Sequence, residues 1–306
     1  MKDTDFITAS SFIRTLESRL LTKSKLDSLI SLQHFSDIAK GLSQDTDYNL
    51  TAVSTLDQAE AVLKEEWERV CNLLYKVSPH KAAVDIVLLP YEFHALRCAL
   101  KKALSKTKST EPLSEDMEKL LAQASLMEED SQRKEIFLDK KMFEAMKKIG
   151  KELNSELIAE QVQMRIDFYN IKTMLRAREM DKDSAFFEYC YEPGGRLTKD
   201  VFVQNYSLPF SALAASFSNK YCNTEVQKGL EAYETHHNFS VLETLFRDSL
   251  IKHLKKAKLI SYGPEILYAY LMAKENELRQ IRLLLTCKSR NISDHILIGK
   301  LGECYV

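Results

Sequence analysis

Acidic and basic side chains recur at one fixed spacing in three segments of the chain. In each segment the acid stands five residues before the base; the pairs are Glu92 with Arg97, Asp167 with Lys172, and Glu277 with Arg282. Five helical residues rotate by about 140° beyond one full turn, so the two charges of a pair do not face each other on one helix. We predict that the three bases bridge helices inside their own domains. The alternative is that they contact a partner protein directly.

A basic run near the end of the chain is a second candidate. Lys252, Lys255 and Lys256 alternate with aliphatic residues in the segment 250–259. This spacing is typical of an amphipathic helix whose lysines form a solvated face above a core stripe. The alternative is a contact with an acidic partner.

The chain lacks the motifs that bind nucleotides or carry out hydrolysis. Walker A, G-x-G-x-x-G, H-E-x-x-H and G-x-S-x-G patterns are all missing from the sequence. His236 and His237 are adjacent, and neighbouring residues on a helix point in different directions, so they make a poor metal site. We therefore predict no catalytic, cofactor-binding or metal-binding residue and no direct nucleotide binding.

The charged, cysteine and apolar residues of the chain limit which partners it can bind and in which compartment it is expected. The 306 residues include 43 bases and 44 acids, a balance that disfavours nucleic-acid binding. The six cysteines form no C-x-x-C pair and are typical of reduced thiols in a cytosolic protein. Crossing a bilayer takes about 20 apolar residues, and no run approaches that length. Any membrane association must therefore come through a partner.

The pattern of apolar residues predicts helices throughout. Glycine and proline are scarce, at eight and six residues, which favours helices over a turn-rich β fold. Pro90 is expected in the first turn of a helix, residues 105–115 form a linker, and residues 191–195 form a turn. Residues 6–42 are expected to form two helices, with a third short apolar stripe at 35–42. The later helices are expected at residues 56 to a break at 78–79, 115 onward, 138–178 with a break near Asn154, 198–204, 209–218, 223–236, 239–257, 263–288 and 293–302. The fold class is all-α, with no sheet.

The three acid–base segments are copies of one helical pattern. Each continues with apolar residues at three- and four-residue spacing, which predicts a buried helix face; these are Phe93, Leu96 and Leu100, then Phe168, Ile171 and Leu175, then Leu278, Ile281 and Leu285. Short flanking echoes, all predicted to open a helix, are Leu21-Thr22-Lys23, Leu113-Ser114-Glu115, Leu197-Thr198-Lys199 and Ile292-Ser293-Asp294. A further echo, Leu56-Asp57, Leu138-Asp139 and Leu242-Glu243, is predicted to start the helix before each copy. The repeat predicts three similar helical domains, at about 1–112, 113–208 and 209–306, in a quasi-threefold body.

An ordered set of segments resembles one known family. The segments are 13–21, Ile166-Asp167-Phe168-Tyr169-Asn170-Ile171-Lys172 with 175–178, Pro193-Gly194-Gly195 with Leu197, 270–271, 274–282, Lys288 and Tyr305-Val306. Together they resemble the C subunit of bacterial and archaeal V-type (A/V-type) ATPases, the counterpart of the eukaryotic V-ATPase d subunit. The resemblance covers essentially the whole chain. Ala95 stands where the first copy usually has Asn, and Gln280 replaces an Asn in the third.

The resemblance implies a funnel-shaped, non-catalytic subunit of the central rotor. Such a protein accepts the tip of the shaft, made by the D and F subunits, and rests on the membrane proteolipid ring, coupling ATP chemistry to the movement of protons or sodium ions. It implies a cytoplasmic location, peripheral to the membrane through the complex. One alternative is an independent helical adaptor or scaffold protein. A helical hydrolase or lyase is disfavoured, because no catalytic constellation is seen.

Overall fold

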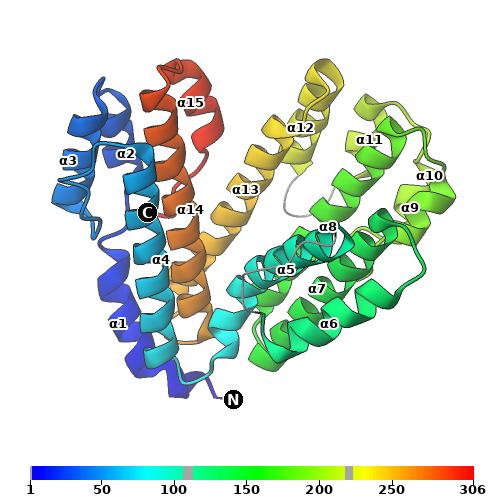
Figure 1. Cartoon of the computed structure of the whole chain (residues 1–306), viewed down its shortest axis with the longest axis horizontal. Coiled ribbons are helices and arrows are strands. Elements are labelled where there is room, and N and C mark those ends of the chain that lie inside the picture. Colours follow the sequence, from blue (N-terminus) through cyan, green and yellow to red (C-terminus); the bar gives the residue numbers. More distant parts are fainter. Residues whose placement is uncertain (1, 106–112, 218–222) are drawn as a thin grey trace. The chain divides into compact units, whose positions relative to one another are not determined.

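The chain folds into helices joined by short connections (Figure 1). The computed structural model describes residues 2–105, 113–217 and 223–306, which contain fifteen α-helices, two 3-10 helices and no β-strand. The prediction of an all-α fold is confirmed. Most of the predicted linker, at 105–115, lies outside the described residues.

The chain divides into two compact units, residues 1–84 with 204–306 and residues 85–203. The first unit holds η1 (Asp3–Phe6), α1 (Ile7–Glu17), α2 (Lys23–Ile30), α3 (Phe35–Asp45), α4 (Leu56–Val77), α11 (Phe210–Ser216), α12 (Asn223–His236), α13 (Ser240–Leu254), η2 (Lys255–Leu259), α14 (Pro264–Ser289) and α15 (Asp294–Leu301). The second holds most of α5 (Ala82–Leu104), then α6 (Glu115–Leu126), α7 (Ser131–Leu153), α8 (Glu156–Glu179), α9 (Ser184–Cys190) and most of α10 (Lys199–Gln204). The division into three domains stays a prediction.

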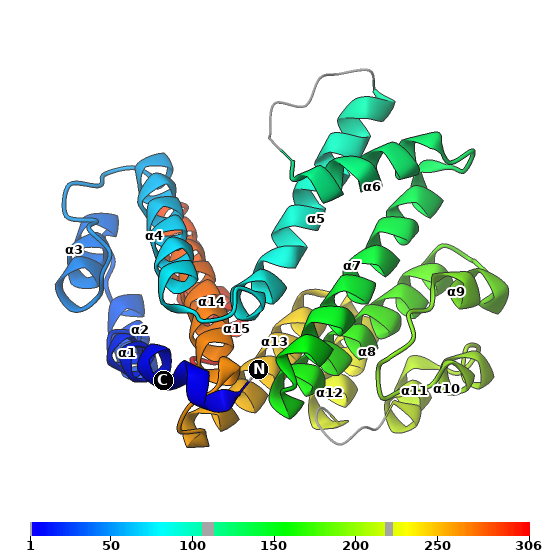
Figure 2. The same ribbon diagram turned by 90° about the horizontal axis from the view of Figure 1, so that it is seen from below.

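Helix α14 is the centre of the first unit. It packs lengthwise against α4 and also contacts α1, α3, α15 and η2, and the two views both place α4 beside it (Figure 1, Figure 2). Leu278, Ile281 and Leu285 are buried in this core with residues from α2, α3 and α15, as their spacing predicted. Segments that lie far apart in the sequence therefore share one core.

Helices α7 and α8 form the centre of the second unit, with α6 packed on α7 and α9 on α8. Phe93, Leu96 and Leu100 of α5 and Ile171 and Leu175 of α8 are buried as predicted, whereas Phe168 is half-buried. The sequence did not predict α9. It is only one to two turns long, and Phe187 in its middle is held by ring contacts with Tyr191 and Phe202.

The predicted start of α5 at Pro90 is wrong. The helix begins at Ala82 and runs through Pro90. A proline inside a helix costs about 3 kcal/mol because one backbone hydrogen bond is lost. Val84, Ile86 and Val87 are buried before it, and their packing outweighs that cost.

Most helix ends follow the local sequence signals. Thr22 and Ser114 accept hydrogen bonds from the backbone N–H groups at the starts of α2 and α6, so these echoes do open helices. Asn154 adopts the left-handed conformation at φ 50° and separates α7 from α8 where the break was predicted. Leu138 lies inside α7, since Asp130 caps that helix earlier, so the prediction that Leu138 starts the helix is wrong.

Candidate functional site

Asp167, the acid of the second copy, is buried in the middle of α8. Its Oδ1 accepts the backbone N–H of Leu197 at 3.0 Å, and its Oδ2 accepts that of Arg196 at 3.1 Å. Burial raises the pKa of Asp167 to about 6, against the opposing effect of these two N–H groups. The carboxylate therefore fixes the segment just before α10.

Glu277, the acid of the third copy, makes the same contact from α14. It is buried, and its Oε2 accepts the backbone N–H of Leu21, just before α2. Leu21 and Leu197 both begin a Leu-Thr-Lys tripeptide, the echo found in the sequence. The two copies thus use an equivalent carboxylate to hold an equivalent helix entry.

An amide three residues after each of these acids makes a second equivalent contact. Asn170 donates to the Glu192 carbonyl at 2.8 Å and accepts the Glu192 N–H at 2.9 Å, holding the chain after α9. Gln280 donates to the carbonyls of Leu301 and Glu303 at 3.2 and 3.1 Å, holding the chain after α15. Carboxylate and amide together form what we call the clamp, a pair of side chains on one helix that fastens irregular backbone to it.

The first copy has a different arrangement on α5. Glu92 is exposed, and Ala95 occupies the amide position. Alanine has no hydrogen-bonding side chain, so α5 carries only half of the residues that make the clamp.

The three bases of the repeat lie in different surroundings. Arg97 pairs with Asp139 of α7, and Arg282 makes two hydrogen bonds to Glu60 of α4 at 2.6 and 2.7 Å. Both contacts join helices, but each spans two of the predicted domains, so neither base stays within its own. Lys172 places its ammonium over the ring of Phe168 on its own helix, 5.6 Å from the ring centre.

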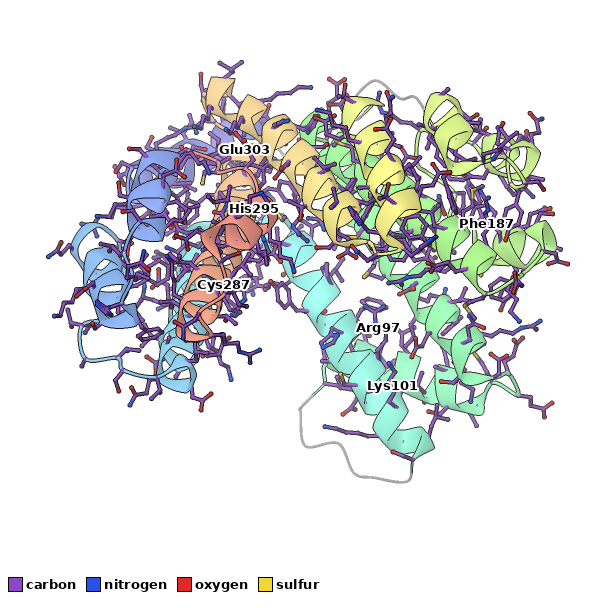
Figure 3. The ribbon with its side chains drawn as sticks, turned by 90° about the horizontal axis from the view of Figure 1, so that it is seen from above. Arg97, Lys101, Phe187, Cys287, His295 and Glu303 are labelled. Atoms are coloured by element: carbon purple, nitrogen blue, oxygen red, sulfur yellow. The ribbon has the colours of Figure 1, made fainter. Side chains whose placement is uncertain are left out.

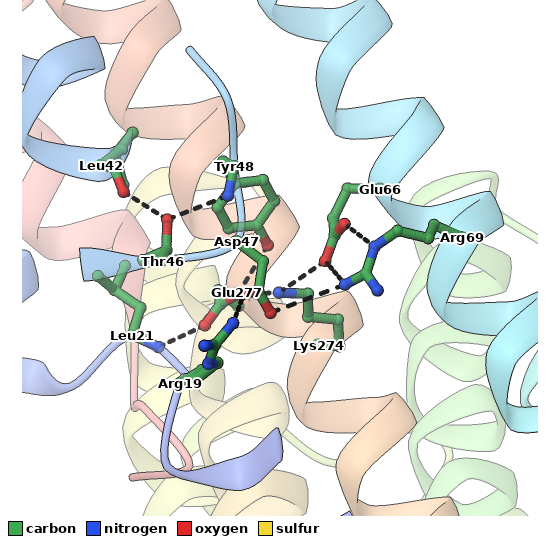
Figure 4. Close-up of polar contacts among 10 residues, drawn as sticks. All are labelled: Arg19, Leu21, Leu42, Thr46, Asp47, Tyr48, Glu66, Arg69, Lys274 and Glu277. Carbon is green, nitrogen blue, oxygen red and sulfur yellow. Dashed lines mark hydrogen bonds and ion pairs between the residues drawn. The ribbon is translucent and has the colours of Figure 1, made fainter. Parts of the chain in front are cut away.

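Glu277 is also the inner end of a chain of alternating charges (Figure 4). Lys274 Nζ lies 2.8 Å from Glu277 and 3.3 Å from Glu66 of α4, and stands over the ring of Tyr48 at 4.4 Å. The Tyr48 hydroxyl donates to Glu277 at 2.6 Å. Lysine and both carboxylates are almost fully buried.

The alternation continues from Glu66 to the surface. Arg69 makes two hydrogen bonds to Glu66, at 2.7 and 2.9 Å, and lies 3.7 Å from Asp47, which pairs with the exposed Arg19 at 2.6 Å. Three cations and three carboxylates therefore alternate between the solvent and the core. Removing Glu66, Lys274 or Glu277 from the buried part of this chain of charges leaves an uncompensated charge, which costs several kcal/mol.

Sequence reasoning found Glu277 but missed the other members of this chain of charges. A signal was present, because Lys274 and Glu277 stand three residues apart in a helix with many apolar residues. Charged residues on such a helix need buried partners. The identity of those partners depends on residues more than 200 positions away and could not be read from local spacing.

The lysines of the basic run already have partners in the first unit. Lys252 pairs with Glu225 at 3.2 Å, and Lys255 pairs with Glu303 at 2.7 Å. Lys256 lies beside Lys255 in η2. These contacts fit the interpretation of the run as a face above the core, because Leu250, Ile251 and Leu254 are buried beneath it.

The buried cysteines, Cys71, Cys190, Cys287 and Cys304, are poor candidates for nucleophiles. Burial raises the pKa of Cys71 to about 12 and that of Cys190 to about 11, so their thiolates are scarce at neutral pH. Among the residues that the structure describes, no three His, Cys, Asp or Glu side chains are grouped so as to hold a metal ion. No helix in this part of the chain has the length and apolar character needed to cross a membrane.

Comparison with known proteins finds one family and its members matching nearly the whole chain. The family described as "ATP synthase (C/AC39) subunit" matches residues 9–125 and 106–297. The C subunit of the V-type sodium ATPase of Enterococcus hirae is 23% identical over 322 residues, covering 96% of this chain and 97% of that protein. The C subunit of the A-type ATP synthase of Pyrococcus abyssi is 25% identical over 332 residues, covering 95% of this chain and 87% of that protein.

An all-helical fold and a match along nearly the whole chain define a subunit of the V/A-type rotary ATPases. The chain belongs to the ATP synthase (C/AC39) subunit family, and the resemblance found in the sequence is confirmed. Ion transport and ATP synthesis are the processes that follow from this membership.

Proposed function

We propose that the protein is the non-catalytic socket of a V/A-type ATPase rotor. In this role it accepts the central shaft, made by the D and F subunits, and rests on the membrane proteolipid ring. It lies on the cytoplasmic side, peripheral to the membrane, and passes torque between the shaft and the proteolipid ring. The observation that carries the proposal is its similarity, over nearly its full length, to the C subunits of a V-type sodium ATPase and of A-type ATP synthases.

The internal contacts support a mechanical role. A part that conveys torque must deform little under load, and closely packed helices have low compressibility. Two of the three repeat helices are fastened to irregular backbone by a clamp, at Asp167 with Asn170 and at Glu277 with Gln280. We propose that this fastening stiffens the socket, and that the three copies correspond to its three similar domains.

The proposal is tested by leaving the chain out of the reconstituted ATPase. We expect the catalytic head to keep hydrolysing ATP while ATP-driven ion transport is lost, and addition of the purified chain should restore transport. The chain alone should show no ATPase activity and should be retained on an affinity column that carries the D and F subunits. Ion transport at the normal rate without the chain would contradict the proposal.

A further inference from the structure

We propose that the segment joining α13 to α14 carries a contact site for the headgroups of a bilayer that contains anionic lipids. The site is residues 258–262, which we call the α13–α14 tip. The inference goes beyond the proposed function, in which the chain meets only proteins. It also goes beyond the expectation that membrane association comes only through a partner.

Leu259 is the most exposed large apolar residue in the described part of the chain, at 89%. Tyr262, three positions later, is 41% exposed. Figure 1 shows the tip at the lower end of α14, where that helix begins. A single exposed leucine is ordinary on a protein surface, so its neighbours decide what it can bind.

Hydrogen bonds from α1 hold the backbone of the tip in place. Arg14 Nη2 donates to the carbonyls of Ala257 and Ile260, both at 2.7 Å. The Gly263 N–H donates to Ser10 Oγ at 3.3 Å. The backbone is therefore anchored on both sides of the exposed leucine and tyrosine, and these side chains project from a fixed segment.

The charge beside the leucine is positive. Lys258 is exposed and stands over the ring of Tyr305 at 4.9 Å, and it pairs with no carboxylate in the part of the chain that the structure describes. Loss of hydration and the charges of Lys255 and Arg14 lower the pKa of Lys258, against the opposing effect of Glu17. An anionic surface would offset this repulsion between cations.

Two carboxylates near Lys258 already have other partners. Glu17 pairs with Arg14 at 2.6 Å, and Glu303, labelled in Figure 3, pairs with Lys255 at 2.7 Å. The positive charge of Lys258 is therefore the one that remains for a ligand at the tip.

A lysine beside an exposed leucine and tyrosine suits the boundary between lipid headgroups and acyl chains. Leucine and tyrosine side chains can enter this boundary while the lysine ammonium stays with the phosphate groups. A nucleic acid would satisfy only the charge, and a protein would need a cavity for a leucine that projects this far. Because the tip is small, the contact should be weak and sensitive to salt.

The first experiment measures co-sedimentation of the purified chain with vesicles. We expect binding to vesicles of phosphatidylglycerol and phosphatidylcholine, weaker binding to phosphatidylcholine alone, and loss of the difference in about 1 M salt, which screens the charges. Leu259→Asp should lower the partition constant by about tenfold, and Lys258→Glu by a similar factor. Both side chains are exposed, so neither change should alter folding, which circular dichroism checks.

The matched control is Leu126→Asp in the second unit. Leu126 is 83% exposed at the end of α6, but the acids Glu128, Glu129 and Asp130 follow it. Its replacement should leave vesicle binding unchanged. Failure of the natural chain to prefer anionic vesicles, or normal binding by Leu259→Asp, would overturn the lipid contact.

A second experiment distinguishes lipid from protein at the tip in the complete ATPase. A fluorescent amino acid that senses its surroundings replaces Leu259 or, as the control, Leu126, and the complex is reconstituted into vesicles with spin-labelled lipid. We expect the lipid to quench the probe at position 259 and not at position 126. A blue-shifted but unquenched signal at 259 would mean that a protein covers the tip, and an unshifted signal that nothing does; either result would overturn the proposal.

The lipid contact and the socket role can fail separately. A chain retained by the column of D and F subunits but not by anionic vesicles would disprove the lipid contact and leave the socket role standing. A chain that binds the vesicles but not the column would disprove the socket role alone.

Discussion

The carboxylate of Glu277 accepts a hydrogen bond from the backbone N–H of Leu21, 256 positions earlier in the chain. The corresponding contact in the second copy is local, since Leu197 lies only 30 positions after Asp167. The second copy therefore holds a helix entry that follows it, whereas the third copy holds the entry to α2 near the N-terminus. This long-range contact fastens α14 to a segment near the N-terminus, whereas the contact of the second copy joins two segments that are close in the sequence.

Replacing Glu277 should be much more damaging than replacing an exposed acid of the same helix pair. Glu277→Gln removes the charge that balances Lys274 and weakens the contacts with Leu21 and Tyr48, so we expect a loss of about 3 kcal/mol in the free energy of unfolding. Glu60→Gln breaks only the half-exposed pair with Arg282 and should cost less than about 1 kcal/mol. Urea unfolding followed by circular dichroism measures both. Equal losses would show that the buried charges have no special role.

Asp167 should make stability depend on pH in the mildly acidic range. Its pKa is about 6 in the folded chain and 3.8 for an unperturbed aspartate, so the folded state binds the proton more tightly. Its contribution is therefore fully present below about pH 4 and is lost as the pH rises through 6, a change of about 3 kcal/mol.

The measurement compares unfolding of the natural chain and of Asp167→Asn between pH 4 and pH 7. Asparagine does not titrate, so the variant should become more stable relative to the natural chain as the pH rises. A constant difference across this range would mean that Asp167 keeps an ordinary pKa.

The sequence predicted elements and cores better than it predicted contacts. Helix periodicity located the buried faces of α5 and α14, and capping residues such as Thr22 located helix starts, because both signals act within a few residues. Pro90 wrongly suggested the start of a helix, because the packing of the residues before it outweighs the cost of a proline inside a helix. Partners such as Glu66 for Lys274 depend on how distant helices meet, and no spacing in the sequence records that.

The acids of the repeat have a role that their spacing from the bases did not predict. Arg97 and Arg282 join helices, and in addition the acids make equivalent contacts in two copies, to Leu197 and Leu21. The shared tripeptide Leu-Thr-Lys marks the two donor segments, but the donor itself is a backbone N–H group, which any residue except proline provides. The link between the tripeptide and the acid could therefore be seen only in the structure.

Gly195 should tolerate no side chain because it lies against Asp167. A Cβ at this position would come within 2.9 Å of the Asp167 Cγ and closer still to Oδ1, and within 3.3 Å of the Asp167 backbone nitrogen. We expect Gly195→Ala to destabilise the protein by about 2 kcal/mol through overpacking. Gly299→Ala is the matched control: it lies in α15 with nothing within 4 Å of the added Cβ, and should stabilise by about 0.5–1 kcal/mol. Thermal unfolding would contradict this account if both variants shifted in the same direction.

Loss of Asn170 should release one half of the second clamp and leave the other half closed. Asn170→Ala removes the acceptor for the Glu192 N–H and the donor to its carbonyl, so the Glu192 amide should exchange about tenfold faster with deuterium. The Leu197 amide is held by Asp167 and should keep its natural rate. Glu179→Ala, at the exposed end of α8, should change neither rate. Amide exchange resolved by residue would distinguish two independent fastenings from one cooperative loop, since in a cooperative loop Leu197 would exchange faster together with Glu192.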